Sequence, residues 1–505
     1  MKKNPILFLL LATVLLTSMM LPVEVYSWQT NGVAVTTAFD DQNLVQIVSD
    51  NTGGAIICWY DERAGATDRN IYAQRIDAQG NKMWSSTDVA ISVVIGSNQD
   101  APKITADGNG GAIIAWKDQR SDSGDIYAQK VDSAGNIQWT LDGVAVCTAS
   151  SQQDNIQIVS DGQGGAIIAW EDGRYDAVSH VYIQHVASSN GAGLWGADGK
   201  RVAGGSINKY LTDMLSDKAD GAYIFIQNNT ANAMNLIFQH LNSTGTAQIS
   251  GNGTEILDLD SYLTNIKAVH SSDNQLIIAG CNKMSDYDVW ATKIDGSGAR
   301  QWGADGVTVC NAEKTQEQVD VLPTTTGGAF VVWTDNRDGE YDLYLQMIGT
   351  SGSLLAINGT TLINLPTSRA IRPNLCTDGE GGAFLVWMDN RTELYYQWFD
   401  IYYQHLDNTG ALDTTLALTG EVLCNAAYSQ IILEYEPCVS NGYKGAIVVW
   451  TDLRADGSTR DIYAGLVGAY PADDGGIPGY SVVLIFPTIA IVALLLRKRQ
   501  LKNLS

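Results

Sequence analysis

One unit recurs along this chain about every 55 residues, and a tandem repeat of that length restricts the fold to solenoids, arrays and rings. The unit begins with two glycines and an apolar run ending in Trp-x-Asp-x-Arg, and continues through Asp-Ile-Tyr-Ala-Gln, a turn and a Gly-Val-Ala-Val segment. Eight copies align, and the fourth and fifth are the most divergent. The tryptophan position is occupied by Trp59, Trp116, Trp170, Ile226, Gly280, Trp333, Trp387 and Trp450.

The two ends of the repeat array complement each other. The eighth copy lacks its last segment, whereas Trp28 and the segment 33–35 before the first copy match Trp139 and the segment 144–146 in type and spacing. A chain that begins with the segment missing from its last repeat can close into a ring by pairing the two. We therefore expect Val33 to lie beside the strand around Ile462.

Each unit contains four strand signals. In the second copy they are the segments 103–106, 112–116, 126–132 and 144–147, with Asp-Gly-Asn-Gly-Gly and Ala-Gly-Asn at the turns. The second segment is apolar throughout, which predicts a strand that is buried on both faces. Eight units of four antiparallel strands predict an all-β, eight-bladed β-propeller over residues 28–468, closed by an N-terminal strand.

The segments outside the repeats predict an exported, membrane-anchored protein. Residues 1–27 have Lys2 and Lys3 ahead of an apolar stretch, as in a secretory signal cleaved before Trp28; an uncleaved signal anchor is the alternative. After a polar linker at 469–479, residues 480–496 reach about 26 Å as one transmembrane helix. The basic tail 497–505 should stay in the cytoplasm, which places a single-pass protein at the cell surface with an exterior propeller.

Charge and cysteine usage exclude several kinds of site. The chain has 55 acidic and 31 basic residues, and this net charge of -24 disfavours nucleic acid as a partner. The seven cysteines fall at positions set by the repeat, which indicates small core residues rather than a disulfide framework. Hairpin turns such as Asp107-Gly108 offer one carboxylate each, too few for calcium. We expect no metal and no cofactor.

The residues after each repeat tryptophan allow two interpretations. They form either a ring of ligand-binding charges or an ion pair and turn cap in each blade, and near-identical copies favour the structural interpretation. A glutamine recurs in the third strand, and we expect it to bond backbone groups of a neighbouring blade. The best-matched charge pairs are Asp118/Arg120, Asp172/Arg174 and Asp335/Arg337.

Long, variable loops predict a ligand-binding patch on one propeller face, because binding residues usually lie on variable loops of a rigid scaffold. Two of these loops carry aromatic side chains that suit a glycan or a protein partner. Alternatively, the loops pack on each other and cap the core. The aromatic candidates are Tyr395, Tyr396, Trp398, Tyr428 and Tyr435. Candidate glycosylation sequons begin at Asn228, Asn242, Asn252, Asn358 and Asn390.

Three parts of the chain resemble known families. The segments 164–174 and 125–132 resemble propeller repeats of large prokaryotic surface proteins. Pro478-Gly479-Tyr480, the apolar span and the basic tail resemble C-terminal sorting signals of archaeal surface proteins, with Tyr480 where the better-known form has Phe. The hairpin 132–139 is similar to the tryptophan-docking repeat of eight-bladed quinoprotein dehydrogenases, although it has one residue fewer between Asp and Gly and the chain lacks their vicinal cysteine pair.

These observations predict a non-catalytic recognition or adhesion module that binds an extracellular protein or glycan through loops on one propeller face. One alternative is a propeller enzyme, either quinoprotein dehydrogenase-like or glycan-cleaving, and another is a structural envelope protein. The central channel separates these classes. Convergent carboxylates or arginines there, with a pocket of ligand size, would favour an enzyme.

Overall fold

The computed structural model describes residues 28–469, apart from gaps at 175–177, 230–233, 258–261, 284–285, 393–397 and 433–435. The chain divides into a unit that ends at Ala469 and a second unit, Tyr470–Ser505. The expected signal segment, linker, transmembrane helix and tail lie essentially outside the described residues, so these assignments stay predictions. Within the described ranges, no helix has the length and apolar character needed to cross a membrane.

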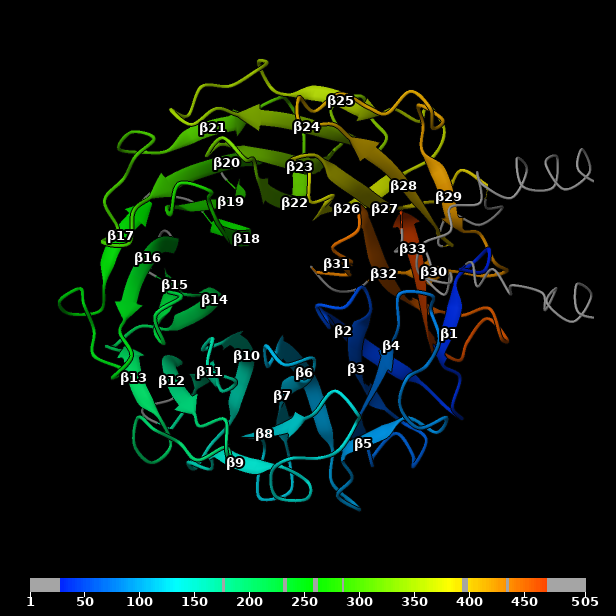
Figure 1. The fold of residues 1–505 in the computed structure, drawn as a ribbon. Helices are drawn as coiled ribbons and strands as arrows, with labels where there is room; N and C mark the ends of the chain where they lie inside the picture. The colour runs from blue at the N-terminus through cyan, green and yellow to red at the C-terminus, as the bar shows by residue number, and fades with distance from the viewer. Residues whose placement is uncertain are drawn as a thin grey trace, which may run out of the picture. The chain divides into compact units, whose positions relative to one another are not determined.

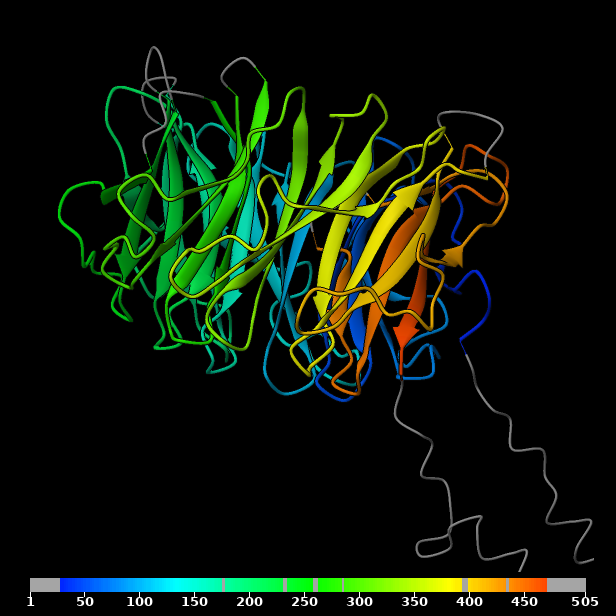
Figure 2. The ribbon, with the colours of Figure 1, turned by 90° about the horizontal axis from the view of Figure 1, so that it is seen from above.

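The described strands form eight antiparallel sheets, arranged as blades around a central channel (Figure 1). Seven sheets have four strands and the eighth has five. Seen after a quarter turn, the strands run between the two faces of the ring, so the loops collect on those faces (Figure 2). The predicted all-β, eight-bladed propeller is confirmed.

Within each blade the strands follow one another from the channel outwards. The innermost strands are β2 (Gln42–Ser49), β6 (Gln99–Ala106), β10 (Gln153–Ser160), β14 (Lys209–Ser216), β18 (Tyr262–His270), β22 (Gln316–Pro323), β26 (Ala370–Thr377) and the pair β30 (Gln430–Ile431) and β31 (Cys438–Ser440). The second strands are β3 (Ala55–Asp61), β7 (Ala112–Asp118), β11 (Ala166–Asp172), β15 (Ala222–Asn229), β19 (Leu276–Lys283), β23 (Ala329–Asp335), β27 (Ala383–Asp389) and β32 (Gly445–Asp452).

The remaining strands complete the blades. The third strands are β4 (Asn70–Ile76), β8 (Asp125–Val131), β12 (His180–Val186), β16 (Met234–Leu241), β20 (Tyr287–Ile294), β24 (Asp342–Ile348), β28 (Asp400–Leu406) and β33 (Asp461–Gly468). The outermost strands are β5 (Val89–Ser92), β9 (Val144–Cys147), β13 (Lys200–Ala203), β17 (Thr254–Leu257), β21 (Val307–Cys310), β25 (Thr360–Ile363), β29 (Glu421–Cys424) and, in the eighth blade, β1 (Val33–Thr36).

The second strands are buried on both faces because each lies between two neighbouring blades. In β7, Ile113 packs with residues of the third blade such as Ile168, whereas Ile114 packs with residues of the first blade such as Ile56. A strand with an apolar neighbour on each side cannot alternate apolar and polar residues. This accounts for the continuous apolar runs from which the blades were predicted.

The N-terminal strand closes the ring as predicted. β1 pairs antiparallel with β33, so that Val33 lies opposite Ala464 and Thr36 opposite Ile462. Val35 is fully buried in a cluster that contains residues of both the first and the last blade. Closure therefore pairs the backbone of the last blade's third strand and covers an apolar blade face at the same time.

The Trp-x-Asp-x-Arg motif fixes the loop that follows each second strand. The indole N–H of Trp116 donates to the Asp118 carboxylate at 2.8 Å, and the same carboxylate accepts the backbone N–H of Arg120 at 2.9 Å and its Nη2 at 2.6 Å. The Arg120 guanidinium lies 3.9 Å from the centre of the Tyr127 ring. The structure thus places an ion pair and a turn cap here, with equivalent sets at Trp59, Trp170, Trp333, Trp387 and Trp450.

A second tryptophan links neighbouring blades. Trp139 Nε1 donates to the Ser188 carbonyl of the next blade at 3.1 Å, and the indole covers Gly191, whose φ is +70°. The recurring glutamines bond within their own blade instead: Gln129 Nε2 donates to the Thr140 carbonyl at 2.6 Å and its Oε1 accepts the Trp139 N–H at 3.0 Å. Our prediction that these glutamines join blades was wrong, because their amides hold the turn that carries the docking tryptophan.

Candidate functional site

A β-bulge interrupts the innermost strand in the first seven blades. In β2, for example, the pairing with β3 jumps between Asn43 and Gln46, and Leu44 adopts a φ of 51°. The left-handed conformation recurs at this step in non-glycine residues, which is uncommon and costs free energy unless the surrounding structure enforces it. The recurring residues with positive φ are Leu44, Ala101, Asn155, Asn265, Gln318 and Arg372.

The residue at which pairing resumes after the bulge holds the same register position in seven blades. All seven carry an amide or a charged group at the inner wall of the ring, and together we call them the channel ring. In the eighth blade the Val449 N–H instead donates to the Pro437 carbonyl. The channel ring consists of Gln46, Lys103, Gln157, Asp213, Lys267, Asp320 and Asn374.

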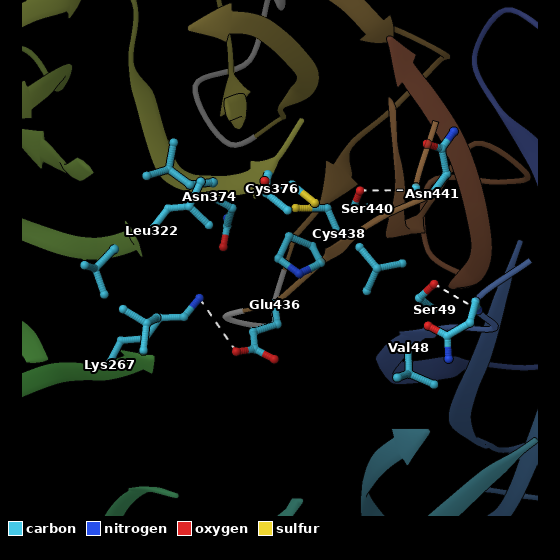
Figure 3. Close-up of a pocket in the computed structure, with 18 of the residues that line it drawn as sticks. Val48, Ser49, Lys267, Leu322, Asn374, Cys376, Glu436, Cys438, Ser440 and Asn441 are labelled. Carbon is cyan, nitrogen blue, oxygen red and sulfur yellow. Dashed lines mark hydrogen bonds and ion pairs between the residues drawn. The ribbon is translucent and has the colours of Figure 1, made fainter. Parts of the chain in front are cut away.

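Two cavities open along this channel. One of about 520 Å³ is lined by inner-strand residues from six blades and by Glu436 of the eighth, which places it at the ring's centre. The other, of about 720 Å³, lies beside the last two blades (Figure 3). Both are lined by Lys267 and by Glu436, a residue that precedes β31. Their volumes are in the range of small-molecule sites, and the shared residues join the two spaces.

A charged cluster lies where the cavities meet. Lys267 Nζ is 2.7 Å from Asp320 Oδ1 and 3.7 Å from Glu436 Oε1. Asp213, on the strand β14 next to β18, belongs to the same electrostatic group. We call Asp213, Lys267, Asp320 and Glu436 the channel cluster. It brings together residues of the fourth, fifth, sixth and eighth blades.

Burial and charge shift the ionisation of the cluster. Burial, helped by nearby Glu436, raises the pKa of the Asp213 carboxyl to about 7 despite the lowering effects of the Ala268 N–H and Lys267. Burial alone would lower the pKa of Lys267, but Asp320, Glu436 and Asp213 outweigh it and raise the pKa. Near neutral pH the cluster therefore combines a carboxyl group that can hold a proton with an ammonium group that keeps its charge.

The three carboxyl groups differ in how firmly they are held. Asp320 is 4% exposed, and its second oxygen accepts the Leu375 N–H at 2.6 Å. Asp213 accepts the Ala268 N–H of the next blade at 2.7 Å. Glu436 is 75% exposed, and its carboxylate lies 3.7 Å from the Lys267 ammonium group. Asp320 thus fixes Lys267, whereas the Glu436 carboxylate faces the cavity and is accessible to a ligand.

The aromatic residues predicted to bind a ligand are only partly described. Trp398 and Tyr428 lie in edge-to-face contact, with ring centroids 5.2 Å apart. Tyr395, Tyr396 and Tyr435 lie outside the described residues. The structure therefore brings together one residue from each of the two predicted loops. Their role in ligand contact stays a prediction.

The sequon residues have different surroundings. Asn390 is 6% exposed and its Oδ1 accepts the Arg369 N–H at 2.7 Å. Asn252 Nδ2 donates to the Gly204 carbonyl at 2.8 Å, and Asn242 Oδ1 caps its own turn. Asn358 Oδ1 accepts the Asn311 N–H, and Asn228 lies within β15. All five are described, and their glycosylation stays a prediction.

The channel cluster is the candidate site that the sequence analysis missed. The repeat was recognised by its invariant residues, whereas the channel ring occupies a position that differs between copies. A usable signal was present, because the residue seven places before the position of the first glycine of the Gly-Gly pair is charged in the second, fourth, fifth and sixth copies, although the fourth and fifth have Asp-Gly and Asn-Gln in place of that pair. The predicted site residues of the Trp-x-Asp-x-Arg motif, in contrast, cap the loops that follow the second strands.

Comparison with known proteins supports the propeller fold but identifies no family for this chain. No protein-family model and no curated protein matches the chain. A polysaccharide lyase, an ulvan lyase of family PL25 bound to a GlcA–Rha3S saccharide, is 11% identical over 75% of this chain and 95% of its own, with a TM-score of 0.47. Polysaccharide lyase Uly1 is 9% identical over 77% and 93%, with a TM-score of 0.42. A thermostable family-43 glycoside hydrolase is 10% identical over 54% and 92%, with a TM-score of 0.29.

These findings correct the predicted function. The sequence led us to expect a recognition or adhesion module without catalysis, whereas the matched proteins named above are enzymes. At these identities the likeness concerns the fold alone. The channel adds an independent observation, because it holds convergent carboxyl groups and a ligand-sized cavity, the features that we expected to favour an enzyme. The molecule is an eight-bladed β-propeller whose central channel holds a charged cluster beside a ligand-sized cavity.

Proposed function

We propose that this protein is a glycan-cleaving enzyme whose active site is the channel cluster. The observation that carries the proposal is the convergence of Asp213, Lys267 and Glu436 from three different blades on one cavity of about 520 Å³. Structural ion pairs seldom need an exposed carboxylate next to a solvent-filled cavity. Cleavage of a glycosidic bond, in contrast, requires two carboxyl groups in different protonation states.

The surroundings of each group suggest its role. Asp213, whose pKa lies near 7, supplies the proton that the departing sugar oxygen needs. Glu436 reaches the cavity as an exposed carboxylate and acts as the base that activates the attacking water. Lys267 is held by Asp320 at 2.7 Å, so its positive charge is fixed where negative charge develops during cleavage.

The test is an activity screen of the purified full-length chain on soluble polysaccharides, read out as new reducing ends. Asp213→Asn keeps an oxygen for the Ala268 N–H but removes the titrating proton, and Glu436→Gln removes the base. We expect each variant to lower kcat by about 100-fold or more. Because the acid must be protonated, wild-type activity should fall as the pH rises through about 7.

Matched controls separate catalysis from general damage. Asp305→Asn and Glu340→Gln make the same chemical changes at exposed positions away from the channel and should leave kcat unchanged. Full activity of both Asp213→Asn and Glu436→Gln on a cleaved substrate would contradict the assignment. A product with a new carbon–carbon double bond would keep the channel site but replace hydrolysis with elimination.

A further inference from the structure

Two cysteines meet at the junction of the last two blades. Cys376 lies in β26 and Cys438 begins β31, and both line the cavity of about 720 Å³. Figure 3 shows their sulfur atoms facing each other. The two strands belong to different sheets, so the backbone hydrogen bonds of each strand run to its own blade. A bond between these sulfurs would therefore join two blades covalently.

The other five cysteines are placed differently. Cys58 and Cys281 are fully buried in separate blades. The remaining three lie at the ends of outermost strands, each with its thiol 3.0–3.2 Å from the arginine of the Trp-x-Asp-x-Arg motif: Cys147, Cys310 and Cys424. Cys376 and Cys438 thus differ from the rest in having a thiol as neighbour and a cavity in front of them.

The strand that carries Cys438 is weakly held by its own sheet. The innermost strand has eight or nine residues in the first seven blades, but in the last blade it is split into β30 with two residues and β31 with three. β31 pairs with β32 through three residues, starting at Cys438 opposite Val448. A cross-link at Cys438 would fix this short strand, and with it Glu436 two residues earlier.

We propose that Cys376 and Cys438 form a disulfide bond that staples the seventh blade to the eighth. This inference does not depend on the proposed function. It revises the interpretation of all seven cysteines as core residues, which was based on repeat position and could not show that two first-strand positions face each other across a blade junction. In the described structure both thiols are reduced.

A disulfide oxidant such as glutathione disulfide balances the reaction. Cys438 is the more exposed of the two, so its thiolate attacks the oxidant, breaks the sulfur–sulfur bond and releases one glutathione thiolate. Cys376 then attacks the sulfur of Cys438 and releases the second. The two thiol protons pass to the two glutathione molecules, and the electron pair reduces the oxidant.

The neighbouring groups make this bond slow to form. The pKa of the Cys438 thiol is raised by its hydrogen bond with Cys376 and by burial. Since the thiolate is the attacking species, the rate should increase with pH. The pair therefore suits a lasting structural staple rather than a rapid redox switch.

The experiment uses the purified full-length chain, first reduced and then equilibrated with glutathione disulfide. The chain is then unfolded, free thiols are labelled with N-ethylmaleimide, and masses and peptides are analysed. We expect two fewer labelled thiols than in the reduced chain and a peptide that links Cys376 to Cys438. The oxidised chain should also unfold at a higher temperature, by on the order of 4 °C.

Alanine variants provide the controls. Cys376→Ala and Cys438→Ala should each abolish the loss of two thiols, whereas Cys281→Ala, at a fully buried cysteine in another blade, should retain it. If a variant does not fold, the peptide map of the unaltered chain decides by itself. Complete labelling of all thiols after equilibration, or a linkage between other cysteines, would overturn the proposal.

Discussion

The Asp213 carboxyl shows how the position of a single residue in the ring determines its chemistry. It occupies the same register position as Gln157 in the preceding blade and Lys267 in the next. Burial raises its pKa from the usual 3.8 to about 7. The unfolded chain lacks this environment, so the folded chain binds the proton more tightly, and stability must depend on pH through this group.

Asp213 should make the protein more stable at low pH. Its contribution is fully present below the unfolded pKa of about 4 and is lost as the pH rises through about 7. Asp213→Asn removes the titration. Between pH 5 and pH 8 the wild-type chain should lose roughly 2–3 kcal/mol of unfolding free energy relative to this variant. Urea unfolding of both proteins at the two pH values measures the difference, and parallel losses would contradict the assigned pKa.

At the scale of the element, a tryptophan side chain that packs on a turn of the next blade joins neighbouring blades at five junctions in the described structure. Trp84 Nε1 donates to the Ser133 carbonyl of the second blade at 3.0 Å, and its indole covers Gly135. Gly135 has a φ of +86°, and a Cβ atom added there would lie 2.8 Å from the indole. Close approach of the backbone to a flat ring explains why glycine occupies this turn.

Gly135→Ala should therefore lower the free energy of unfolding by more than the strain of the left-handed backbone alone would. Gly108, in another hairpin turn of the same blade, has a φ of +77° and open space where a Cβ would point. Gly108→Ala should cost about 1 kcal/mol for the left-handed backbone. Gly135→Ala should cost about 1–3 kcal/mol more, because the methyl group displaces the indole. Chemical unfolding followed by tryptophan fluorescence compares the two, and equal losses would show that docking contributes nothing.

Most strands could be predicted from the sequence, but the innermost strand of each blade could be predicted only in part. The apolar second strands and the Trp-x-Asp-x-Arg turns repeat closely, so period and composition predicted them. The innermost strands extend further than expected, since β6 begins at Gln99 rather than at Lys103. The bulge between these residues hides the alternation that marks a strand. Three residues of the channel cluster, Asp213, Lys267 and Asp320, lie directly after such bulges, which is why sequence patterns did not reveal them.

At the scale of the whole molecule, stability depends on one pairing between residues about 430 positions apart. Val35 on β1 is fully buried with Ile57 of the first blade and Ile462 of the last. The closing strand therefore belongs to the cores on both sides of the junction. Complementary ends were visible in the sequence, so the ring could be predicted without a structure.

Weakening this closure should affect both blades that meet there. Val35→Ala removes two buried methyl groups and should cost about 2–3 kcal/mol. Ala34→Ser, a change at the adjacent exposed residue, should cost less than about 0.5 kcal/mol. Amide hydrogen exchange in β2 and β33 should accelerate in Val35→Ala but not in Ala34→Ser. Acceleration limited to β33 would mean that the first blade does not depend on the closing strand.

The order of the channel ring has one more consequence. Blades one to three present Gln46, Lys103 and Gln157, and blades four to six present Asp213, Lys267 and Asp320 at the same register positions. The second triplet is the first with its amides replaced by acids, on the next three blades of the ring. The scaffold thus has two sets of three equivalent channel-ring positions, and in the first set the lysine is the only charged residue. Replacing Gln46 and Gln157 by aspartate would give the first set of positions the same charges as the second set.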